Sequence, residues 1–316
     1  MKFPPTLAVR VARVEAVTPA IKRFTLEPAE GDALPGFSVG SHVVVHMPDG
    51  GRTHRNAYSL LGAAGGSSVY QIAVRRQERS RGGSVYMHER VKVGDVLQIT
   101  PPSNLFPIDR LAAKHILIAG GIGITPFMSY IRDLSAQTAP YELHYAYRTP
   151  EQAAFRDELA MQLGERLHEY DAASGRRLIP RTLLADQPLG THVYVCGPES
   201  LTESVIEAAR GLGWPASHVH YERFAAPQPG RPFKVNCARS EREIDVPGDL
   251  SLLEALEAAG MDVPSMCRGG VCGRCATDLL EGEAEHRDSY LPAELRSRKI
   301  MPCVSRANCE RLVIDL

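Results

Sequence analysis

Four cysteines near the C-terminus have a spacing that suits metal chemistry. Cys267 is followed by Cys272 after four intervening residues and by Cys275 after two more, and Cys303 lies further along the chain. This spacing matches the plant-type pattern Cys-x4-Cys-x2-Cys…Cys of [2Fe–2S] clusters. The glycines between these cysteines give the backbone the freedom to wrap a cluster, and their amide groups can donate hydrogen bonds to its sulfurs. We therefore predict that the four thiolates hold a [2Fe–2S] cluster.

A structural zinc site is the alternative for the same cysteines. Zinc sites with four cysteines usually pair two short knuckles, whereas here three cysteines share one loop. Of the seven cysteines in the chain, Cys237 and Cys309 are interpreted as small apolar side chains. Cys196 is either a buried residue or part of a binding site, because it ends an apolar strand.

A glycine-rich loop in the middle of the chain suits phosphate binding. Residues 120–126, Gly-Gly-Ile-Gly-Ile-Thr-Pro, follow an apolar run and precede a helix expected over 126–134. Backbone amides at a helix N-terminus favour anions, and glycines permit close approach. A second turn, Cys196-Gly197-Pro198, follows a strand expected over 192–196. Since ligands bind at the carboxyl ends of parallel strands, we expect both turns to line one crevice. An ordinary tight turn is the alternative.

Two segments nearer the N-terminus, residues 55–60 and 81–84, form a candidate flavin site. In the first, Arg55 is expected to bind a phosphate, Tyr58 to flank an isoalloxazine ring and Ser59 to form a hydrogen bond near its N5. The second offers backbone amides and a hydroxyl to the same phosphate. A surface strand followed by a glycine turn is the alternative. The expected flavin contacts are Arg55, Asn56, Ala57, Tyr58, Ser59, Ile72, Ala73, Val74, Arg81, Gly82, Gly83 and Ser84.

In this order along the whole chain, these motifs resemble the phthalate dioxygenase reductase family, which includes the vanillate demethylase reductases. The resemblance implies FMN in a barrel, a nicotinamide site in an α/β domain and a C-terminal plant-type ferredoxin domain. It implies that Phe224 stacks over the flavin, although a core position is the alternative, and that Thr125 touches both flavin and nicotinamide. The expected catalytic residues are therefore Ser59, Thr125 and Phe224.

The elements that position these residues fall into three blocks. Short strands separated by Gly and Pro clusters predict an antiparallel β-barrel flavin domain over 1–108. Alternating strands and helices predict an α/β domain with a parallel sheet over 109–226, which includes a helix over 151–163. Residues 227–232 are expected to be a linker. A β-grasp-like ferredoxin domain is expected over 233–316.

The implied function is an NADH-dependent reductase that passes electrons through FMN and a [2Fe–2S] cluster to a separate terminal oxygenase. The oxygenase is expected to be a separate protein because this chain lacks a Rieske-type cysteine–histidine pattern. The resemblance implies that it is a Rieske-type dioxygenase or an O- or N-demethylase. Arg148 suits a 2′-phosphate, but we favour NADH. A redox sensor, a general ferredoxin-type carrier and a zinc-stabilised interaction module are the alternatives. The expected nucleotide contacts are Gly120, Gly121, Gly123, Thr125, Arg148, Cys196, Gly197 and Pro198.

Composition and charge narrow the class of protein further. The chain has 316 residues and a formal net charge of -1, which argues against a nucleic-acid binder. It contains no apolar run of membrane-spanning length, and we expect a cytoplasmic monomer. From residue 233 onward there are 11 Lys and Arg against 15 Asp and Glu, a net charge of -4. Our hypothesis is that this acidic part docks on a basic patch of the oxygenase, with a generic solvated surface as the alternative.

Overall fold

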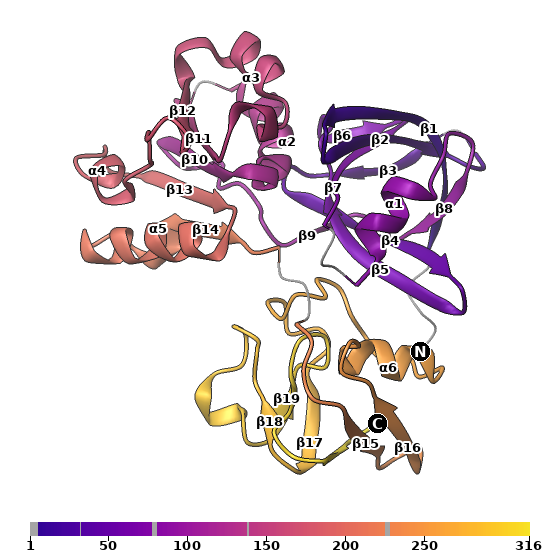
Figure 1. The fold of residues 1–316 in the computed structure, drawn as a ribbon. Helices are drawn as coiled ribbons and strands as arrows, with labels where there is room; N and C mark the ends of the chain where they lie inside the picture. The colour runs from indigo at the N-terminus through magenta and orange to yellow at the C-terminus, as the bar shows by residue number, and fades with distance from the viewer. Residues whose placement is uncertain (1–5, 32, 78–80, 138, 225–227) are drawn as a thin grey trace. The chain divides into compact units, whose positions relative to one another are not determined.

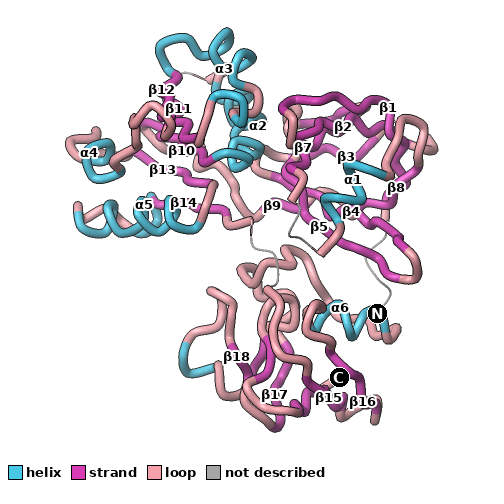
Figure 2. The backbone as a smooth tube through the Cα atoms, in the orientation of Figure 1, coloured by secondary structure: helices cyan, strands magenta, loops and turns pink. Residues whose placement is uncertain are grey.

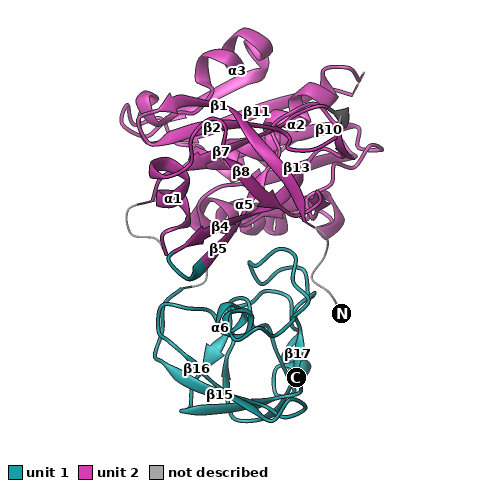
Figure 3. Ribbon diagram, turned by 90° about the vertical axis from the view of Figure 1, so that its right-hand side faces the viewer, with its two compact units in different colours: residues 1–5, 50–52, 225–316 teal, residues 6–49, 53–224 magenta. Residues whose placement is uncertain are grey.

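The computed structural model describes residues 6–31, 33–77, 81–137, 139–224 and 228–316, and it divides into two compact units (Figure 3). The larger unit consists of Thr6–Asp49 and Thr53–Phe224. The C-terminal unit contains Ala225–Leu316 together with Met1–Pro5 and Gly50–Arg52. The segments expected to bind flavin and nucleotide therefore share the larger unit, and the cysteine loop lies in the C-terminal unit.

The first part of the larger unit is a seven-stranded sheet with the order β5-β4-β8-β1-β2-β7, with β9 paired to β4 (Figure 1). Side chains that alternate along its strands bury one face, so that Val9, Phe24 and Ile72 are fully buried. The elements are β1 (Leu7–Thr18), β2 (Ile21–Pro28), β3 (Leu34–Phe37), β4 (Ser41–Asp49), β5 (Arg52–Ser59), β6 (Gly65–Ser67), β7 (Tyr70–Arg75), α1 (Gly83–Glu89), β8 (Val96–Ile99) and β9 (Ser103–Asn104).

The second part of the larger unit is the predicted parallel sheet, with the order β12-β11-β10-β13-β14. The central strand β10 is apolar along most of its length because helices cover a parallel sheet on both faces. The elements are β10 (Lys114–Gly120), η1 (Gly121–Ile124), α2 (Thr125–Leu134), β11 (Tyr141–Tyr147), η2 (Pro150–Gln152), α3 (Arg156–Leu163), η3 (Gly164–Arg166), β12 (Leu167–Asp171), α4 (Pro180–Leu184), β13 (Thr191–Cys196), α5 (Glu199–Gly211), η4 (Ala216–His218) and β14 (Val219–Glu222).

Two local expectations are wrong. The helix expected over 151–163 begins only at Arg156, after a 3-10 turn, because Phe155 takes a left-handed backbone conformation (φ 60°) with its ring buried. The simple glycine turn considered as the alternative at 81–84 instead leads into helix α1, which starts at Gly83. In both places, packing against residues distant in the chain decides the backbone, and this does not show in local composition.

The two parts of the larger unit share a hydrophobic core. Ile21 and Ala73 from the first sheet belong to the same buried cluster as Leu117 and Phe127 from the second part. Phe106, in the connection between the two parts, stacks on Tyr130 with ring centroids 5.6 Å apart. Burial of this mostly apolar surface stabilises the two parts as one body.

The C-terminal unit is a mixed five-stranded sheet with the order β16-β15-β21-β17-β19 and a separate β18-β20 pair (Figure 2). Its helix α6 starts with a capping box, in which the hydroxyl of Ser251 accepts a hydrogen bond from the amide of Glu254 and the Glu254 carboxylate accepts one from the amide of Ser251. The elements are β15 (Phe233–Cys237), β16 (Arg242–Val246), α6 (Leu252–Ala258), β17 (Thr277–Glu281), β18 (Ala284–Glu285), η5 (Ala293–Leu295), β19 (Lys299–Ile300), β20 (Arg306–Ala307) and β21 (Arg311–Ile314).

The helices in the described part of the chain are short, and α5 is 13 residues long. Across the described ranges, no helix has both the length and the apolar character needed to cross a membrane.

Three histidines stack at one end of the parallel sheet. The ring centroid of His192 lies 4.1 Å from that of His218 and 5.2 Å from that of His220. His192 Nδ1 and His220 Nε2 are 3.0 Å apart, so one ring nitrogen donates a hydrogen bond and the other accepts it. Burial lowers the pKa of His220 to about 4, and His192 contributes to this shift. The stack therefore requires neutral rings.

We expect acid to destabilise the larger unit through this stack. Because the folded-state pKa of His220 lies below its value in the unfolded chain, the unfolded chain binds more protons as the pH falls from about 6.5 towards 4. The free energy of unfolding should fall in that window, and His220→Asn should show a smaller fall than wild type. Urea unfolding at pH 7.5 and 5.5 measures this, with Tyr221→Phe as the control. An equal fall in wild type and His220→Asn would contradict the prediction.

Candidate functional site

The four predicted cluster cysteines converge in the C-terminal unit. The thiol of Cys267 lies within hydrogen-bonding distance of those of Cys272 and Cys303, and Cys303 also reaches Cys275. The amide of Gly269 donates to Cys267 Sγ at 3.4 Å. Hydrogen bonds among these thiols lower the pKa of Cys267 and raise the pKa of Cys272 and Cys303, so the four sulfurs are close enough to share protons. The residues present therefore fit a cluster ligated by four thiolates.

A buried ion pair holds the loop that contains these cysteines. Arg268 donates two hydrogen bonds to the carboxylate of Glu257 at 2.7 and 2.8 Å, and the two side chains are only 10% and 2% exposed. Arg268 has a left-handed backbone conformation (φ 53°), which turns the chain immediately after Cys267. Helix α6 therefore fixes the first turn of the cysteine loop through Glu257.

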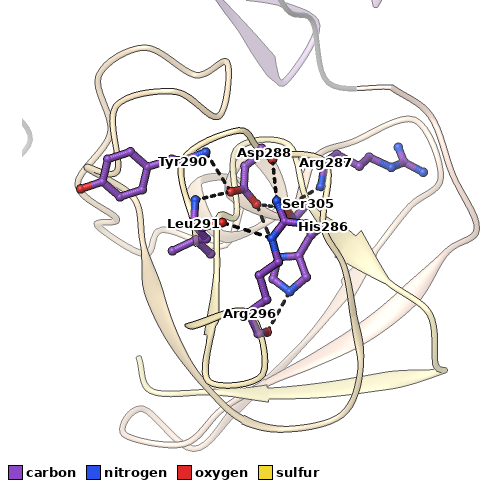
Figure 4. A network of polar contacts seen from close by, with 7 residues as sticks. All are labelled: His286, Arg287, Asp288, Tyr290, Leu291, Arg296 and Ser305. Carbon is purple, nitrogen blue, oxygen red and sulfur yellow. Dashed lines mark hydrogen bonds and ion pairs between the residues drawn. The ribbon is translucent and has the colours of Figure 1, made fainter. Parts of the chain in front are cut away.

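A second loop supports the cysteine loop through Asp288 (Figure 4). One carboxylate oxygen of Asp288 accepts hydrogen bonds from the amides of Leu291 and Tyr290, and the other accepts from the hydroxyl of Ser305. The amide of Ser289 donates to the carbonyl of Gly270 at 3.2 Å. Ser305 lies two residues after Cys303, so this network ties the fourth cysteine to the loop that bears the other three.

Two glycines of the cysteine loop are needed for close packing. A side chain at Gly273 would collide with the ring of Tyr290, and one at Gly270 would come within 2.6 Å of Val304. Both glycines also have positive φ angles, which other residues rarely adopt. The remaining cysteines of this unit differ from each other: Cys237 is fully buried, as expected, and Cys309 is partly buried.

The candidate flavin residues on β5 include one buried group without a partner. Ser59 is 4% exposed, and its Oγ forms no hydrogen bond with the described residues. Asn56 Nδ2 donates to the hydroxyl of Tyr58 at 3.2 Å, while burial raises the pKa of Tyr58 to about 12. A buried hydroxyl that lacks a partner is the feature expected where a polar group of a cofactor binds. Arg55 is half-buried on the same strand, and Ala57 is exposed.

The predicted flavin contacts on β7 divide between two faces. Ile72 and Val74 are fully buried in the core of the first sheet, whereas Ala73 belongs to the core shared with the parallel sheet. The side chains of Ile72 and Val74 are therefore packing residues. Of the phosphate-binding candidates, Arg81 is half-buried, and Gly83 and Ser84 are buried at the start of α1, after Gly82.

A cavity of about 820 Å³ lies between the first sheet and the carboxyl edge of the parallel sheet. Four of the predicted nucleotide residues line it, namely Gly120, Gly121, Arg148 and Pro198. Many other lining groups were not predicted from sequence, among them the turn over 18–21, Arg75, Tyr170 and the arginines at 176 and 177. They come from other strands and loops, and no local motif marks them.

Close contact between the two glycine turns shapes one wall of this cavity. A side chain at Gly123 would collide with the backbone of Cys196, and one at Gly120 would lie 2.5 Å from the Pro198 ring. A side chain at Gly197 would in turn collide with the backbone of Gly120. These glycines therefore allow two turns to pack together, while Gly121 (φ 54°) has open space around its Cα.

The remaining predicted site residues differ in accessibility. Cys196 is fully buried and does not line the cavity, and burial raises the pKa of its thiol. Thr125 is 2% exposed and donates from Oγ1 to the carbonyl of Ile122 at 3.0 Å. Phe224 is 47% exposed, so it is not a core residue.

Sequence analysis also missed Glu222, which is the register partner of Cys196 at the end of β14. Its Oε2 is buried and has no hydrogen-bond partner among the described residues. Burial raises the pKa of Glu222 to about 8, so this carboxyl is protonated at neutral pH and can donate a hydrogen bond. A glutamate that follows a short strand gives no sequence signal for such a role.

The chain is similar to known proteins both in its C-terminal part and over almost its whole length. Residues 235–308 match the family described as 2Fe-2S iron-sulfur cluster binding domain. The chain is 36% identical over 318 residues to phthalate dioxygenase reductase of Burkholderia cepacia, covering 98% of this chain and 97% of that protein. A solved phthalate dioxygenase reductase superposes with a TM-score of 0.88 at 35% identity, over 98% of both chains. The chain belongs to the phthalate dioxygenase reductase family.

Two further matches concern other oxygenase systems. This reductase is 52% identical over 310 residues to the heme-dependent oxidative N-demethylase beta subunit of Ectopseudomonas mendocina (strain ymp), covering 98% of this chain and 99% of that protein. Residues 97–219 match the family described as dimethylamine monooxygenase subunit DmmA-like, N-terminal domain. The predicted class, a reductase component of an oxygenase system that uses FMN, NADH and a [2Fe–2S] cluster, is confirmed.

The glycine contact makes a stability prediction for this reductase. Gly123→Ala should lower the free energy of unfolding by about 1–3 kcal/mol, because the added methyl group must displace the backbone at Cys196. It should also raise the KM for NADH, since the displaced turn forms the cavity wall. Gly62→Ala is the control, because the nearest atom to its added carbon is 3.8 Å away. Urea unfolding and steady-state kinetics test the pair, and equal stability of the two variants would contradict the prediction.

The buried ion pair makes a prediction for the cluster. Glu257→Gln leaves the Arg268 guanidinium buried without its counter-charge, which typically costs about 3–5 kcal/mol. We expect the variant to lose its visible iron–sulfur absorbance faster than wild type in the presence of a chelator. Glu281→Gln, an exposed change on β17, is the control. The same rate of loss in Glu257→Gln and Glu281→Gln would show that the pair does not hold the loop.

Proposed function

We propose that this reductase serves a separate terminal oxygenase that acts on methylated amines. The observation that carries the proposal is the 52% identity, over 98% of the chain, to the beta subunit of an oxidative N-demethylase. The match of residues 97–219 to a dimethylamine monooxygenase subunit supports the same substrate class. Of the partners expected from sequence, an N-demethylating oxygenase is therefore favoured over an aromatic-ring dioxygenase.

We assign the electron-transfer roles to residues on the basis of the geometry above. When bound, FMN supplies the conversion between a two-electron hydride and single electrons, because a [2Fe–2S] cluster takes one electron at a time. Ser59 offers its buried, unpaired hydroxyl to the flavin near N5. Thr125 and Phe224 are assigned to the side of the flavin that meets the nicotinamide. Arg55 and the segment around Ser84 bind the flavin phosphate.

The cavity is assigned to NADH. Its lining includes arginines at 75, 148, 176 and 177, a set of positive charges that suits a pyrophosphate. Gly121 leaves open space for close approach of a phosphate to the backbone. Glu222, buried at the end of β14 beside Cys196, has a raised pKa and therefore adds no negative charge near this edge of the sheet.

We propose that the first sheet closes into a barrel, as expected from the sequence. An isolated bridge between Leu60 and Ile72 joins the end of β5 to β7, which supports closure of the first sheet into a barrel. We propose three domains at 1–108, 109–226 and 233–316, the last with a β-grasp-like fold. We also propose that the protein is a cytoplasmic monomer and that the acidic part from residue 233 onward contacts the oxygenase.

The test of this function uses the purified holoprotein with a candidate amine oxygenase. We expect flavin bands and broad iron–sulfur absorption that NADH bleaches, and NADH-dependent release of formaldehyde from a methylated amine when the oxygenase is added. A colourless protein would overturn the cofactor assignment. Bleaching without electron delivery to the oxygenase would instead favour the alternative of a general carrier. A delivery rate that does not change with ionic strength would overturn the acidic docking surface.

The role of Ser59 is tested by Ser59→Ala. Loss of one neutral hydrogen bond, about 0.5–1.5 kcal/mol, should slow flavin reduction by NADH by roughly twofold to thirteenfold. The FMN content should stay unchanged, because the phosphate contacts remain. Stopped-flow absorbance measures the rate, with Ser135→Ala at the end of α2 as the control. A reduction rate equal to that of wild type would remove Ser59 from the mechanism.

A further inference from the structure

Three potential metal ligands meet on the parallel sheet, away from the cysteine loop. Glu142 and His144 lie two residues apart on β11, so they point to the same face. His168 on β12 is the register partner of His144, and β12 is the edge strand of this sheet. Parallel pairing in this register therefore brings two imidazoles and one carboxylate together.

The geometry of this group suits one small cation. One ligand atom from each of the three residues lies within 4.8 Å of the other two. Glu142 Oε1 is 3.3 Å from His144 Nε2, and Glu142 Oε2 is 3.9 Å from His168 Nε2. The two imidazole rings stack with centroids 4.6 Å apart. Because the ring planes are only 15° from parallel, the exposed His168 ring must turn for its lone pair to meet an ion that binds all three atoms at about 2.0–2.2 Å.

The buried histidine is oriented as a ligand. His144 is 4% exposed, and its Nε2 faces the carboxylate of Glu142. Its Nδ1 lies 2.9 Å from the hydroxyl of Tyr170. When Nδ1–H donates to that hydroxyl, the lone pair of Nε2 points towards Glu142 and His168. Such a second hydrogen bond is the usual means by which proteins orient metal-binding histidines.

We propose that Glu142, His144 and His168 form a binding site for a divalent cation of the zinc class. Two imidazoles and one carboxylate are ligands that zinc accepts, whereas magnesium and calcium prefer oxygen ligands alone. His168 is 44% exposed, so water completes the coordination from the solvent side. The site lies next to the cavity, because Tyr170 also lines that cavity.

The positive charge of Lys114 lies next to this site and should weaken the binding of a cation. Its Nζ is 3.1 Å from Glu142 Oε1, so it neutralises part of the carboxylate charge. Oε2 remains directed towards His168, which leaves one oxygen for a metal. The lysine should therefore weaken metal binding without abolishing it, and its removal should tighten binding.

The test is equilibrium dialysis of the holoprotein against Zn²⁺, with elemental analysis that counts zinc per two iron atoms. Iron serves as the internal count, since the intact cluster occupies the four cysteines. We expect wild type to bind one more zinc ion per chain than His168→Asn or Glu142→Gln binds. Lys114→Gln should bind this zinc more tightly, and excess Mg²⁺ should not displace it.

The control variant is His218→Asn, which removes a histidine from the other stack, where its ring lies 4.1 Å from that of His192. It should keep the zinc that His168→Asn loses. Equal zinc content in wild type and His168→Asn would overturn the proposal. Loss of zinc in His218→Asn but not in His168→Asn would also overturn it, because the metal would then belong to the other stack.

Discussion

The approach of two glycine turns at the carboxyl edge of the parallel sheet is the contact on which the cavity of about 820 Å³ depends. Gly123 packs against the backbone of Cys196, and Gly120 against the ring of Pro198, with no room for a side chain at either glycine. This contact fixes the ends of β10 and β13 relative to each other. Because the two strands are neighbours in register, the turns that follow them must share one space, and only glycine permits it.

The shared core of the larger unit adds rigidity to this arrangement. The core that contains Phe106, Phe127 and Tyr194 extends from the first sheet into the parallel sheet. Burial of large aromatic side chains across this boundary resists relative motion of the two parts. The guanidinium of Arg23 lies over the ring of Phe155 at 5.7 Å and pairs with Glu158 at 3.4 Å. The flavin and nicotinamide that we propose for the two parts would thus be held at a constant distance, which hydride transfer requires.

The C-terminal unit brings together four cysteine sulfurs, the candidate ligands of the cluster. Three come from one loop, and the fourth comes from a segment tied to that loop by Asp288 and Ser305 (Figure 4). The buried pair between Arg268 and Glu257 adds a fixed point on helix α6. Because metal ligation requires thiolates, binding of iron releases the thiol protons, and the protein supplies the frame that holds the four sulfurs together.

Residue types at fixed local spacing were enough to predict a [2Fe–2S] cluster domain, the convergence of its four cysteines, the parallel sheet and the family. The lining of the cavity could not be predicted in this way, since Arg75, Tyr170 and the turn at 18–21 meet there from separate strands. The sequence also left open whether Cys196 is buried or part of a site, and it gave no signal for the raised pKa of Glu222 beside it. Burial and the pKa of a carboxyl depend on atoms that are distant in the chain and become neighbours only when it folds, and local spacing does not encode them.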